Sequence, residues 1–461
     1  MPTALANAAN VAQVTGINAA GVIATVRGAP WKAWRAHENT KDDGEKLKRD
    51  VDMLEYVQRR LQEQEHNPLA TWLLPRLEET LKEARDLMKR SSRMDRFING
   101  SRLAERFRDV ETKVNIIYLS SFPLLSCGTE EFTLAEVMAA TNFTVVLSAS
   151  DSATVYRGTL RDGREVAVKR LNNTGAGPGR AAVQDAFFTE VAILSLIHHD
   201  HIARLVGTCA YGDERIVVTH PCTGNGSLYD HLHGRRTRTS RVTASWEARV
   251  QVLLGAARAV EHLHCHAVPH IIHANVTSSA ILLEGATWAP RLSDFGRAVW
   301  LEAGVESQAV DLAAAAEGYA DPEHRSTGRL KPASDVYSLG VVMLEVLTGK
   351  PPVERVWDEG SGAMVTMGMD LVSFALPSIQ HQQAGGGRLL DVLDRRPAPD
   401  PTAGQLQPLQ MLANTAARCL RQCGDDRPPI RDVVADLEKA LSLICPGNKL
   451  GGDGPTSSGG A

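Results

Sequence analysis

Apolar positions in the first part of the chain recur every three or four residues. Four such stripes occupy residues 11–26, 47–61, 72–88 and 97–117, and the breaks between them contain turn residues such as Gly28, Pro68 and Asn99. Since a helix that buries one face repeats every 3.6 residues, each stripe indicates an amphipathic helix. We therefore predict an all-α four-helix bundle over residues 1–125.

The pattern changes from about residue 130. Two short β-branched runs, Thr154–Tyr156 and Glu165–Lys169, flank a Leu-Arg-Asp-Gly turn at 160–163, which predicts a hairpin. Helical spacing returns at 187–197 and dominates beyond about residue 245, so a helix-rich lobe should follow a strand-rich lobe. The Gly/Ser-rich stretch 446–461 predicts a disordered tail. The expected class is α+β.

Composition and charge exclude several classes of protein. The 461 residues are 43% hydrophobic and 23% charged, which is ordinary for a globular chain. A formal net charge of −4 argues against a nucleic-acid partner, and no apolar run is long enough for a transmembrane helix. The start lacks the features of a signal peptide or a myristoylation motif. The seven scattered cysteines indicate reduced structural thiols and, with these absences, a cytoplasmic protein.

The charge is distributed unevenly between the two parts. Residues 1–125 hold 20 basic and 17 acidic residues, whereas the remainder holds 30 and 37. Within the first part, residues 89–108 carry seven basic and two acidic residues. Two interpretations stay open: a peripheral contact with anionic lipid at the plasma membrane, and a solvated face with local salt bridges. The second is the commoner origin of such a run.

A series of short motifs follows one order in the second part. It comprises Val166-Ala167-Val168-Lys169, Phe187-Phe188-Thr189-Glu190-Val191, Gly226-Ser227-Leu228, Asp294-Phe295-Gly296, Asp321-Pro322-Glu323, Asp335-Val336-Tyr337-Ser338 and Arg427-Pro428. In this order they resemble the kinase domain of plant receptor-like and receptor-like cytoplasmic kinases. The resemblance implies a bilobal protein-kinase-like fold over 126–445. The small lobe would cover about 132–222 and the large lobe about 223–445.

The phosphate-covering loop departs from the family pattern. Residues 148–155 read Ser-Ala-Ser-Asp-Ser-Ala-Thr-Val, where the family has G-x-G-x-x-G-x-V. All three glycines are replaced, and Asp151 adds a charge of the same sign as a phosphate. Because side chains limit close backbone approach, we expect weakened phosphate binding.

The catalytic loop departs further. The family pattern H-R-D-L-K-x-x-N is here His-Ala-Asn-Val-Thr-Ser-Ser-Ala over 273–280. Asn275 replaces the catalytic aspartate, Thr277 replaces the lysine that neutralises the transferred phosphate, and Ala280 removes a magnesium ligand. Ala274 replaces the arginine that binds the phosphate on the activation loop of the family. The stretch 297–316 contains no Thr or Tyr, and its only Ser is Ser307. These losses predict a catalytically impaired homologue and no intact catalytic residue, hence not an enzyme.

Other positions that the family uses are retained. The resemblance implies an ion pair between Lys169 and Glu190, adenine contacts from Val155, Ala167 and Leu282, and one magnesium ligand from Asp294. Whether ATP with magnesium binds stays open, since Lys169 and Glu190 would also serve as a structural strut. The resemblance also implies a hydrophobic spine formed by Leu194, His273 and Phe295. It implies that Asp335 anchors the backbone of the catalytic loop. It further implies a buried ion pair between Glu323 and Arg427.

The histidines between His262 and His273 invite a metal interpretation. They show no tetrahedral ligand spacing, and His262 and His273 match structural histidines of the family. We therefore expect no metal site there.

The first part carries a second resemblance. Val14-Thr15-Gly16-Ile17, Leu54-Glu55-Tyr56-Val57 and Leu73-Leu74-Pro75-Arg76-Leu77-Glu78 resemble the N-terminal helical domain of plant mid1-complementing-activity proteins. A looser similarity links residues 12–125 to the HeLo-type bundles of mixed-lineage-kinase-domain-like proteins. The resemblance implies self-association or docking at a membrane surface.

Three functions are compatible with these features. The favoured one is a signalling scaffold whose kinase-like domain binds an active protein kinase or a regulatory protein. The alternative is a weakly active atypical Ser/Thr protein kinase that binds ATP and uses Asp294 with one magnesium ion. The third is a cell-death executor in which the kinase-like domain restrains a membrane-active bundle.

Overall fold

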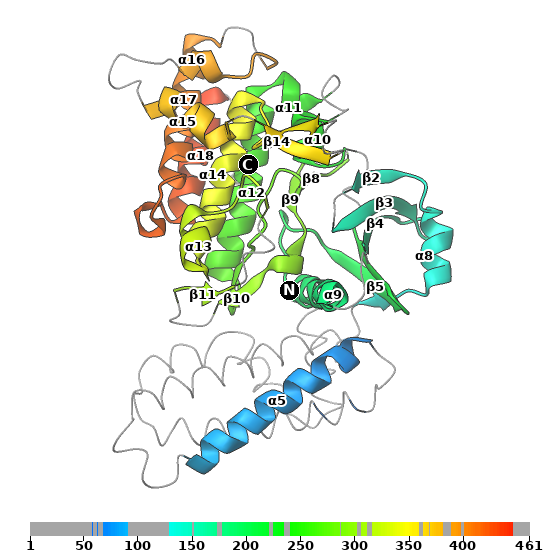
Figure 1. The fold of residues 1–461 in the computed structure, drawn as a ribbon. Helices are drawn as coiled ribbons and strands as arrows, with labels where there is room; N and C mark the ends of the chain where they lie inside the picture. The colour runs from blue at the N-terminus through cyan, green and yellow to red at the C-terminus, as the bar shows by residue number, and fades with distance from the viewer. Residues whose placement is uncertain are drawn as a thin grey trace, which may run out of the picture. The chain divides into compact units, whose positions relative to one another are not determined.

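The computed structural model describes residues 58, 62, 68–90, 129–149, 152–172, 178–220, 225–234, 240–285, 287–301, 306–310, 316–358, 363–367, 369–380, 389–397 and 401–445. These residues fall into two compact units (Figure 1). The first contains the described residues up to 220 with 266–271 and 294–301. The second contains 225–265, 272–293 and the described residues from 306 onward. Strand-rich and helix-rich units together give the predicted α+β kinase-like fold.

The third predicted helical stripe forms a helix, α5 (Pro68–Arg90). Leu73, Leu77, Leu81 and Ala84, which share one face at spacings of three and four, are each at most 1% exposed. The other three stripes, and with them the four-helix arrangement, lie outside the described residues.

A six-stranded sheet organises the first unit, with strand order β1-β5-β6-β4-β3-β2. Its strands are β1 (Glu130–Glu131), β2 (Val146–Ala149), β3 (Ala153–Thr159), β4 (Glu165–Leu171), β5 (Leu205–Tyr211) and β6 (Glu214–Thr219). β3 and β4 form the predicted hairpin in an unbroken antiparallel register from Ala153↔Leu171 to Thr159↔Glu165. The turn between them uses Gly163 at φ +84°, a conformation that costs glycine little.

Two helices cover this sheet. α8 (Leu134–Thr141) begins with a capping box in which Thr133 and Glu136 satisfy each other's backbone amides. Its Val137 joins a core of apolar side chains from the central strands, namely Val166, Val168, Val206, Cys209, Ile216 and Val218. α9 (Pro178–Leu196) covers the predicted helical segment and packs on β5 and β6. This packing places Glu190 within the unit, at 2% exposure.

Helices dominate the second unit. They are α10 (Leu228–Leu232), α11 (Arg241–Ala244), α12 (Trp246–Glu261), α13 (Pro322–Thr327), α14 (Pro332–Thr348), α15 (Leu371–Gln380), α16 (Leu389–Val392), α17 (Ala403–Cys419) and α18 (Ile430–Ile444). α14 lies at the centre, in contact with α12, α15 and α17, and α18 packs on α12 and α17 (Figure 1). Nearly every residue of α14 is buried, which agrees with its mostly apolar sequence.

Short strands border the loops that carry the kinase motifs. β7 (His270–Ile272) pairs with β10 (Val299–Leu301), β8 (Ile281–Leu283) with β9 (Pro290–Leu292), and β11 (Gln308–Ala309) with β12 (Arg329–Leu330). A further hairpin joins β13 (Glu354–Asp358) to β14 (Ala363–Met367). No helix among the described residues combines the length and the apolarity that a membrane span requires.

The described cysteines are free thiols. Burial raises the pKa of Cys419 to about 12 and that of Cys209 to about 11. A thiol with a raised pKa is almost entirely protonated at neutral pH and reacts slowly. These two cysteines therefore act as small apolar side chains.

Candidate active site

Lys169 on β4 connects two acidic side chains in the first unit. Its Nζ lies 2.7 Å from Glu190 Oε2 on α9 and 2.5 Å from Asp294 Oδ1. The predicted ion pair between Lys169 and Glu190 is therefore present. The Glu190 side chain is 3% exposed and that of Lys169 is 14% exposed, whereas Asp294 keeps 36% exposure. One carboxylate is thus enclosed and the other faces solvent in part.

Charge pairing controls the protonation of this cluster. Burial alone would lower the pKa of the Lys169 ammonium, but the charges of Asp294 and Glu190 outweigh burial and raise it. The ammonium therefore stays charged at neutral pH. Burial raises the pKa of Glu190, and the Lys169 charge opposes that increase. The cluster places a fixed positive charge beside a partly exposed carboxylate.

The backbone around Asp294 is specialised. Asp294 has φ +68° and precedes a turn of 3-10 helix, Phe295–Arg297. Phe295 is fully buried. A Cβ atom at Gly296 would lie 3.1 Å from Ala186 Cβ of α9, so a larger residue would press on that helix. Close packing of this turn on α9 holds Asp294 within reach of Lys169.

Asp335 anchors the catalytic loop in the second unit, as predicted. Its Oδ2 accepts a hydrogen bond from His273 N and its Oδ1 accepts one from Ala274 N, both at 2.8 Å. His264 Nε2 lies 2.8 Å from Oδ2, and His273 Nε2 lies 3.0 Å from Ser293 O. The contacts of His264 and His273 are therefore structural hydrogen bonds. Within the described residues, no three His, Cys, Asp or Glu side chains form a metal-binding group.

The substituted positions lie inside this anchored loop. Asn275 is 8% exposed, and its backbone N–H donates to His273 Nδ1 at 3.2 Å. The Thr277 hydroxyl lies 2.9 Å from Ser279 Oγ and accepts from Ala280 N at 3.1 Å. Thr277 therefore uses its oxygen to shape the loop, which is a different role from that of the lysine it replaces. Ala280 is 2% exposed.

A buried hydrogen-bond network, absent from the sequence prediction, supports the same loop. Ser278 Oγ donates to Glu345 Oε1 at 2.9 Å, and Tyr319 Oη donates to Glu345 Oε2 at 2.8 Å. His233 Nε2 lies 3.0 Å from Glu345 Oε1. Burial, followed by the Glu345 charge, raises the pKa of Tyr319 well above its usual value, so the phenol remains a donor. The sequence contained one signal of this network, the single glutamate Glu345 in the otherwise apolar run 339–347.

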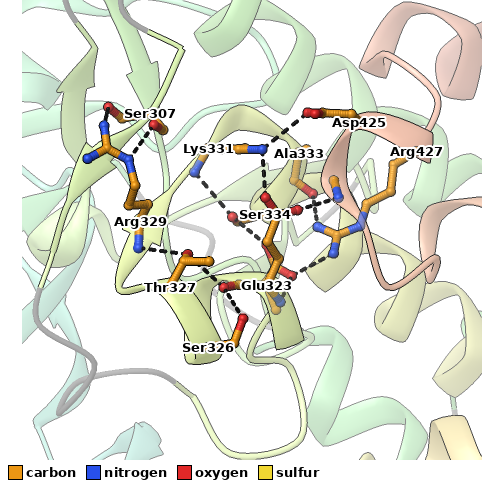
Figure 2. Close-up of polar contacts among 12 residues, drawn as sticks. Ser307, Glu323, Ser326, Thr327, Arg329, Lys331, Ala333, Ser334, Asp425 and Arg427 are labelled. Carbon is orange, nitrogen blue, oxygen red and sulfur yellow. Dashed lines mark hydrogen bonds and ion pairs between the residues drawn. The ribbon is translucent and has the colours of Figure 1, made fainter.

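The predicted ion pair between Glu323 and Arg427 is wrong. Arg427 Nη2 pairs with Asp321 Oδ1 at 2.6 Å, and their side chains are 0% and 3% exposed. Glu323 pairs with Lys331 at 2.6 Å instead (Figure 2). Asp321 is the N-cap of α13, and this position directs its carboxylate to Ser334 as well as to Arg427. Glu323 lies on the first turn of α13 and accepts from Gly424 N.

The predicted nucleotide-contact residues belong to both units. Val155 pairs with Lys169 across the β3–β4 ladder, and Ala167 is 3% exposed beside it on β4. Leu282 belongs to the second unit, where β8 bridges to Ser227. In the phosphate-covering loop, Ser148 lies on β2 and Ala153 begins β3, while Ser150 and Asp151 lie outside the described residues.

Much of the chain is similar to known proteins. Residues 147–434 match the protein kinase domain. The chain belongs to the protein kinase family. It is 38% identical over 323 residues to the putative serine/threonine-protein kinase-like protein CCR3 of Arabidopsis thaliana, an alignment that covers 68% of this chain and 39% of CCR3. The probable serine/threonine-protein kinase PBL21 of the same plant is 34% identical over 68% of this chain and 78% of its own length.

A third relative is the Arabidopsis serine/threonine-protein kinase PBL27, which is 33% identical over 77% of this chain and 65% of its own. The chain spans about two-fifths of the length of the relatives CCR3 and CCR4. These similarities support the plant receptor-like cytoplasmic kinase resemblance for the second part of the chain.

The expectation of a catalytically impaired scaffold, and of a protein that is not an enzyme, is corrected by these relatives. Proteins 33–38% identical to this chain carry the name of serine/threonine-protein kinases or kinase-like proteins, which favours the kinase alternative. The physical reason is that substitutions in the catalytic loop do not by themselves exclude activity. Phosphoryl transfer depends mainly on positioning and charge neutralisation, so the loss of a base lowers a rate without removing the reaction.

Proposed function

We propose that this protein is a Ser/Thr protein kinase that binds ATP with magnesium and transfers the γ-phosphoryl group to a protein hydroxyl at a low rate. The observation that carries the proposal is the buried connection from Glu190 through Lys169 to Asp294. This connection sets a charged lysine beside a partly exposed carboxylate, an arrangement suited to ATP phosphates and a magnesium ion.

The residues of this cluster would divide the work as follows. Lys169 would neutralise charge on the ATP phosphates, while Glu190 holds the lysine in place from α9. The Asp294 carboxylate keeps 36% exposure, and carboxylate oxygens are the ligands that magnesium prefers. Magnesium, when bound, would neutralise the charge that develops on the transferred group.

The catalytic loop sets the expected rate. Asn275 has an amide oxygen that accepts a hydrogen bond from a substrate hydroxyl but does not take up its proton at neutral pH. General-base assistance contributes about 10²–10⁴ in rate, so transfer should be slower by about that factor. Thr277 supplies no positive charge, which lowers the rate further.

Phosphate transfer from labelled ATP to myelin basic protein tests the proposal. The full chain, assayed with magnesium or manganese, should label serine and threonine slowly. Lys169→Ala and Asp294→Asn should each abolish the labelling, since they remove the charge and the metal ligand. Lys350→Ala is the matched control, because Lys350 contacts the Phe374 ring in the second unit.

Two results would reject the proposal. One is a wild-type chain that labels no hydroxyl with either metal. The other is labelling that continues unchanged in Lys169→Ala and Asp294→Asn, because the phosphate would then come from a contaminating kinase. A thermal shift with ATP separates weak chemistry from absent binding, since only a chain that binds ATP gains stability.

A further inference from the structure

The strand β2 forms one end of the six-stranded sheet in the first unit. Among the described residues it pairs with β3 on one side, and no strand lies on its other side. Val145 O accepts a hydrogen bond from Arg157 N on β3 at 2.9 Å. Because the amide groups of successive strand residues point to alternate sides, those of Val146 point away from β3. The open side of β2 is therefore a template on which another strand can pair.

This open edge carries no charged residue. The stretch 137–150, which runs from α8 through β2, contains no Asp, Glu, Lys or Arg, in a chain that is 23% charged. Part of it lies at the surface, since Met138, Val145 and Val146 are 50%, 52% and 51% exposed. Charged residues and prolines commonly prevent an edge strand from pairing with another chain, and β2 has neither. The centre of a protein interface is likewise poor in charge.

The opposite end of the sheet differs in length and in charge. The strand β1 is two residues long, and its residues Glu130 and Glu131 are both exposed. Glu130 pairs with Arg164 at 2.8 Å, so charges of both signs lie along this edge. A short, charged edge is a poor site for an added strand. Only the β2 end of the sheet is therefore open to pairing.

This distribution of charge favours a second copy of the chain as the partner. A contact with two-fold symmetry brings the same surface of each copy together, so any charge near the axis would face an identical charge. The stretch 137–150 avoids this repulsion because it is uncharged. Two identical strands that pair antiparallel have this symmetry. Since β1 is protected, the contact closes at two copies and does not extend into a filament.

We propose that β2 pairs antiparallel with β2 of a second copy, with Met138, Val145 and Val146 packed beside the new ladder. The register of β2 on β3 shifts between Val146 and Ser148, and such a bulge bends a strand and interrupts regular pairing. The new ladder is therefore short, and we expect a weak dimer. The contact is separate from the self-association predicted for residues 1–125, and it does not depend on the kinase activity proposed above.

Sedimentation velocity of the full chain over a hundredfold range of concentration tests the dimer. The wild type should change from monomer to dimer as its concentration rises. Val146→Lys brings two ammonium groups together at the contact and should raise the dissociation constant by about 10–100-fold. Val268→Lys is the matched control, because it makes the same change at a valine of the first unit that is 59% exposed. It should leave the dissociation constant unchanged.

Two further measurements identify the partner and the place of contact. Val146→Glu alone should also weaken the dimer, whereas an equal mixture of Val146→Lys and Val146→Glu should restore it, since opposite charges then meet. Hydrogen exchange locates the contact. The amides of 144–149 should exchange more slowly at high than at low concentration of the wild type, and Val146→Lys should remove this difference.

Three results would overturn the proposal. The first is a wild-type chain that stays monomeric at every concentration. The second is a dimer that persists in Val146→Lys with unchanged exchange over 144–149, because the association then involves another part of the chain. The third is slow exchange over 144–149 even at the lowest concentration, because a segment of the same chain then covers the edge of β2.

Discussion

Arg427 and Asp321 form an ion pair whose side chains are 0% and 3% exposed, with 2.6 Å between Nη2 and Oδ1. The pair joins the start of α13 to the segment before α18, 106 residues later. Arg427 also donates to three backbone carbonyls, those of Ala333, Arg421 and Gln422. One guanidinium thus satisfies several buried acceptors in the second unit.

Asp321→Asn should lower the free energy of unfolding by about 3–5 kcal/mol, because it leaves the Arg427 charge buried without its partner. Chemical denaturation at pH 7 measures this loss. Glu323→Gln is the control: its partner Lys331 is 22% exposed, so the loss should be about 1 kcal/mol or less. Equal losses in the two variants would contradict the assignment of the buried pair.

The same pair predicts a pH dependence. Burial raises the pKa of Asp321, but hydrogen bonds from Arg427 and Ser334 outweigh burial and lower it below the ordinary value of 3.8. A lowered folded-state pKa adds stability above the unfolded-state pKa, and that stability is lost as the pH falls through the folded-state value. The stability difference between the wild type and Asp321→Asn should therefore be constant above about pH 5 and shrink below about pH 4. A difference that grows on acidification would contradict this sign.

Asn275→Asp should raise the rate of phosphate transfer by about 10²–10⁴, because it restores a carboxylate where the family has its base. Steady-state kinetics with ATP and myelin basic protein measure the change in kcat, and the KM for ATP should stay the same. Asn275→Ala should not exceed the wild-type rate. A folded Asn275→Asp protein without a gain in kcat would show that Thr277 and Ala280 limit the reaction instead.

Tyr319→Phe should destabilise the protein by about 1–3 kcal/mol, because it removes one donor from the fully buried Glu345 carboxylate. Thermal or urea unfolding checks this value. Tyr211→Phe makes the same chemical change at a side chain that is 69% exposed, and it should cost almost nothing. If the two substitutions cost the same, the Glu345 network contributes no stability.

Gly318→Ala should cost about 2–4 kcal/mol through two effects. Gly318 has φ +82°, where a side chain is strained, and a Cβ atom there would lie 2.8 Å from Pro352 Cβ. Gly163→Ala is a matched control, since Gly163 has φ +84° but no atom within 4 Å of an added Cβ. It should cost only about 1–2 kcal/mol, the strain alone. Urea denaturation curves of both variants separate crowding from backbone conformation.

Local patterns predicted much of the fold. The β3–β4 hairpin follows from two β-branched runs on either side of a glycine turn, and α9 follows from its apolar spacing. Both signals come from residues close together in sequence, where propensity and period are informative. The bundle expected for residues 1–125 stays a prediction beyond α5, as do its partners and its membrane contact.

The ion pair of the candidate site was predicted from the resemblance of its motifs to those of kinases. Lys169 and Glu190 are 21 residues apart, and the structure brings them into contact between β4 and α9. Asp335 was predicted from its place in the motif series. The substitutions in the catalytic loop were identified from the sequence, but their effect on the rate of phosphoryl transfer was overestimated. A list of lost groups does not give the rate that the remaining groups support.

The sequence by itself determined the order of the kinase motifs, the alternation of strand and helix, and the presence of Lys169, Glu190 and Asp294. Only the tertiary structure decided that Arg427 selects Asp321 over Glu323 and that Arg329 contacts Ser307. The physical reason is that several acids and bases of suitable charge lie near one another in sequence, so composition leaves their pairing open. The backbone direction at the start of α13 and the register of β11 on β12 determine which of these side chains come into contact.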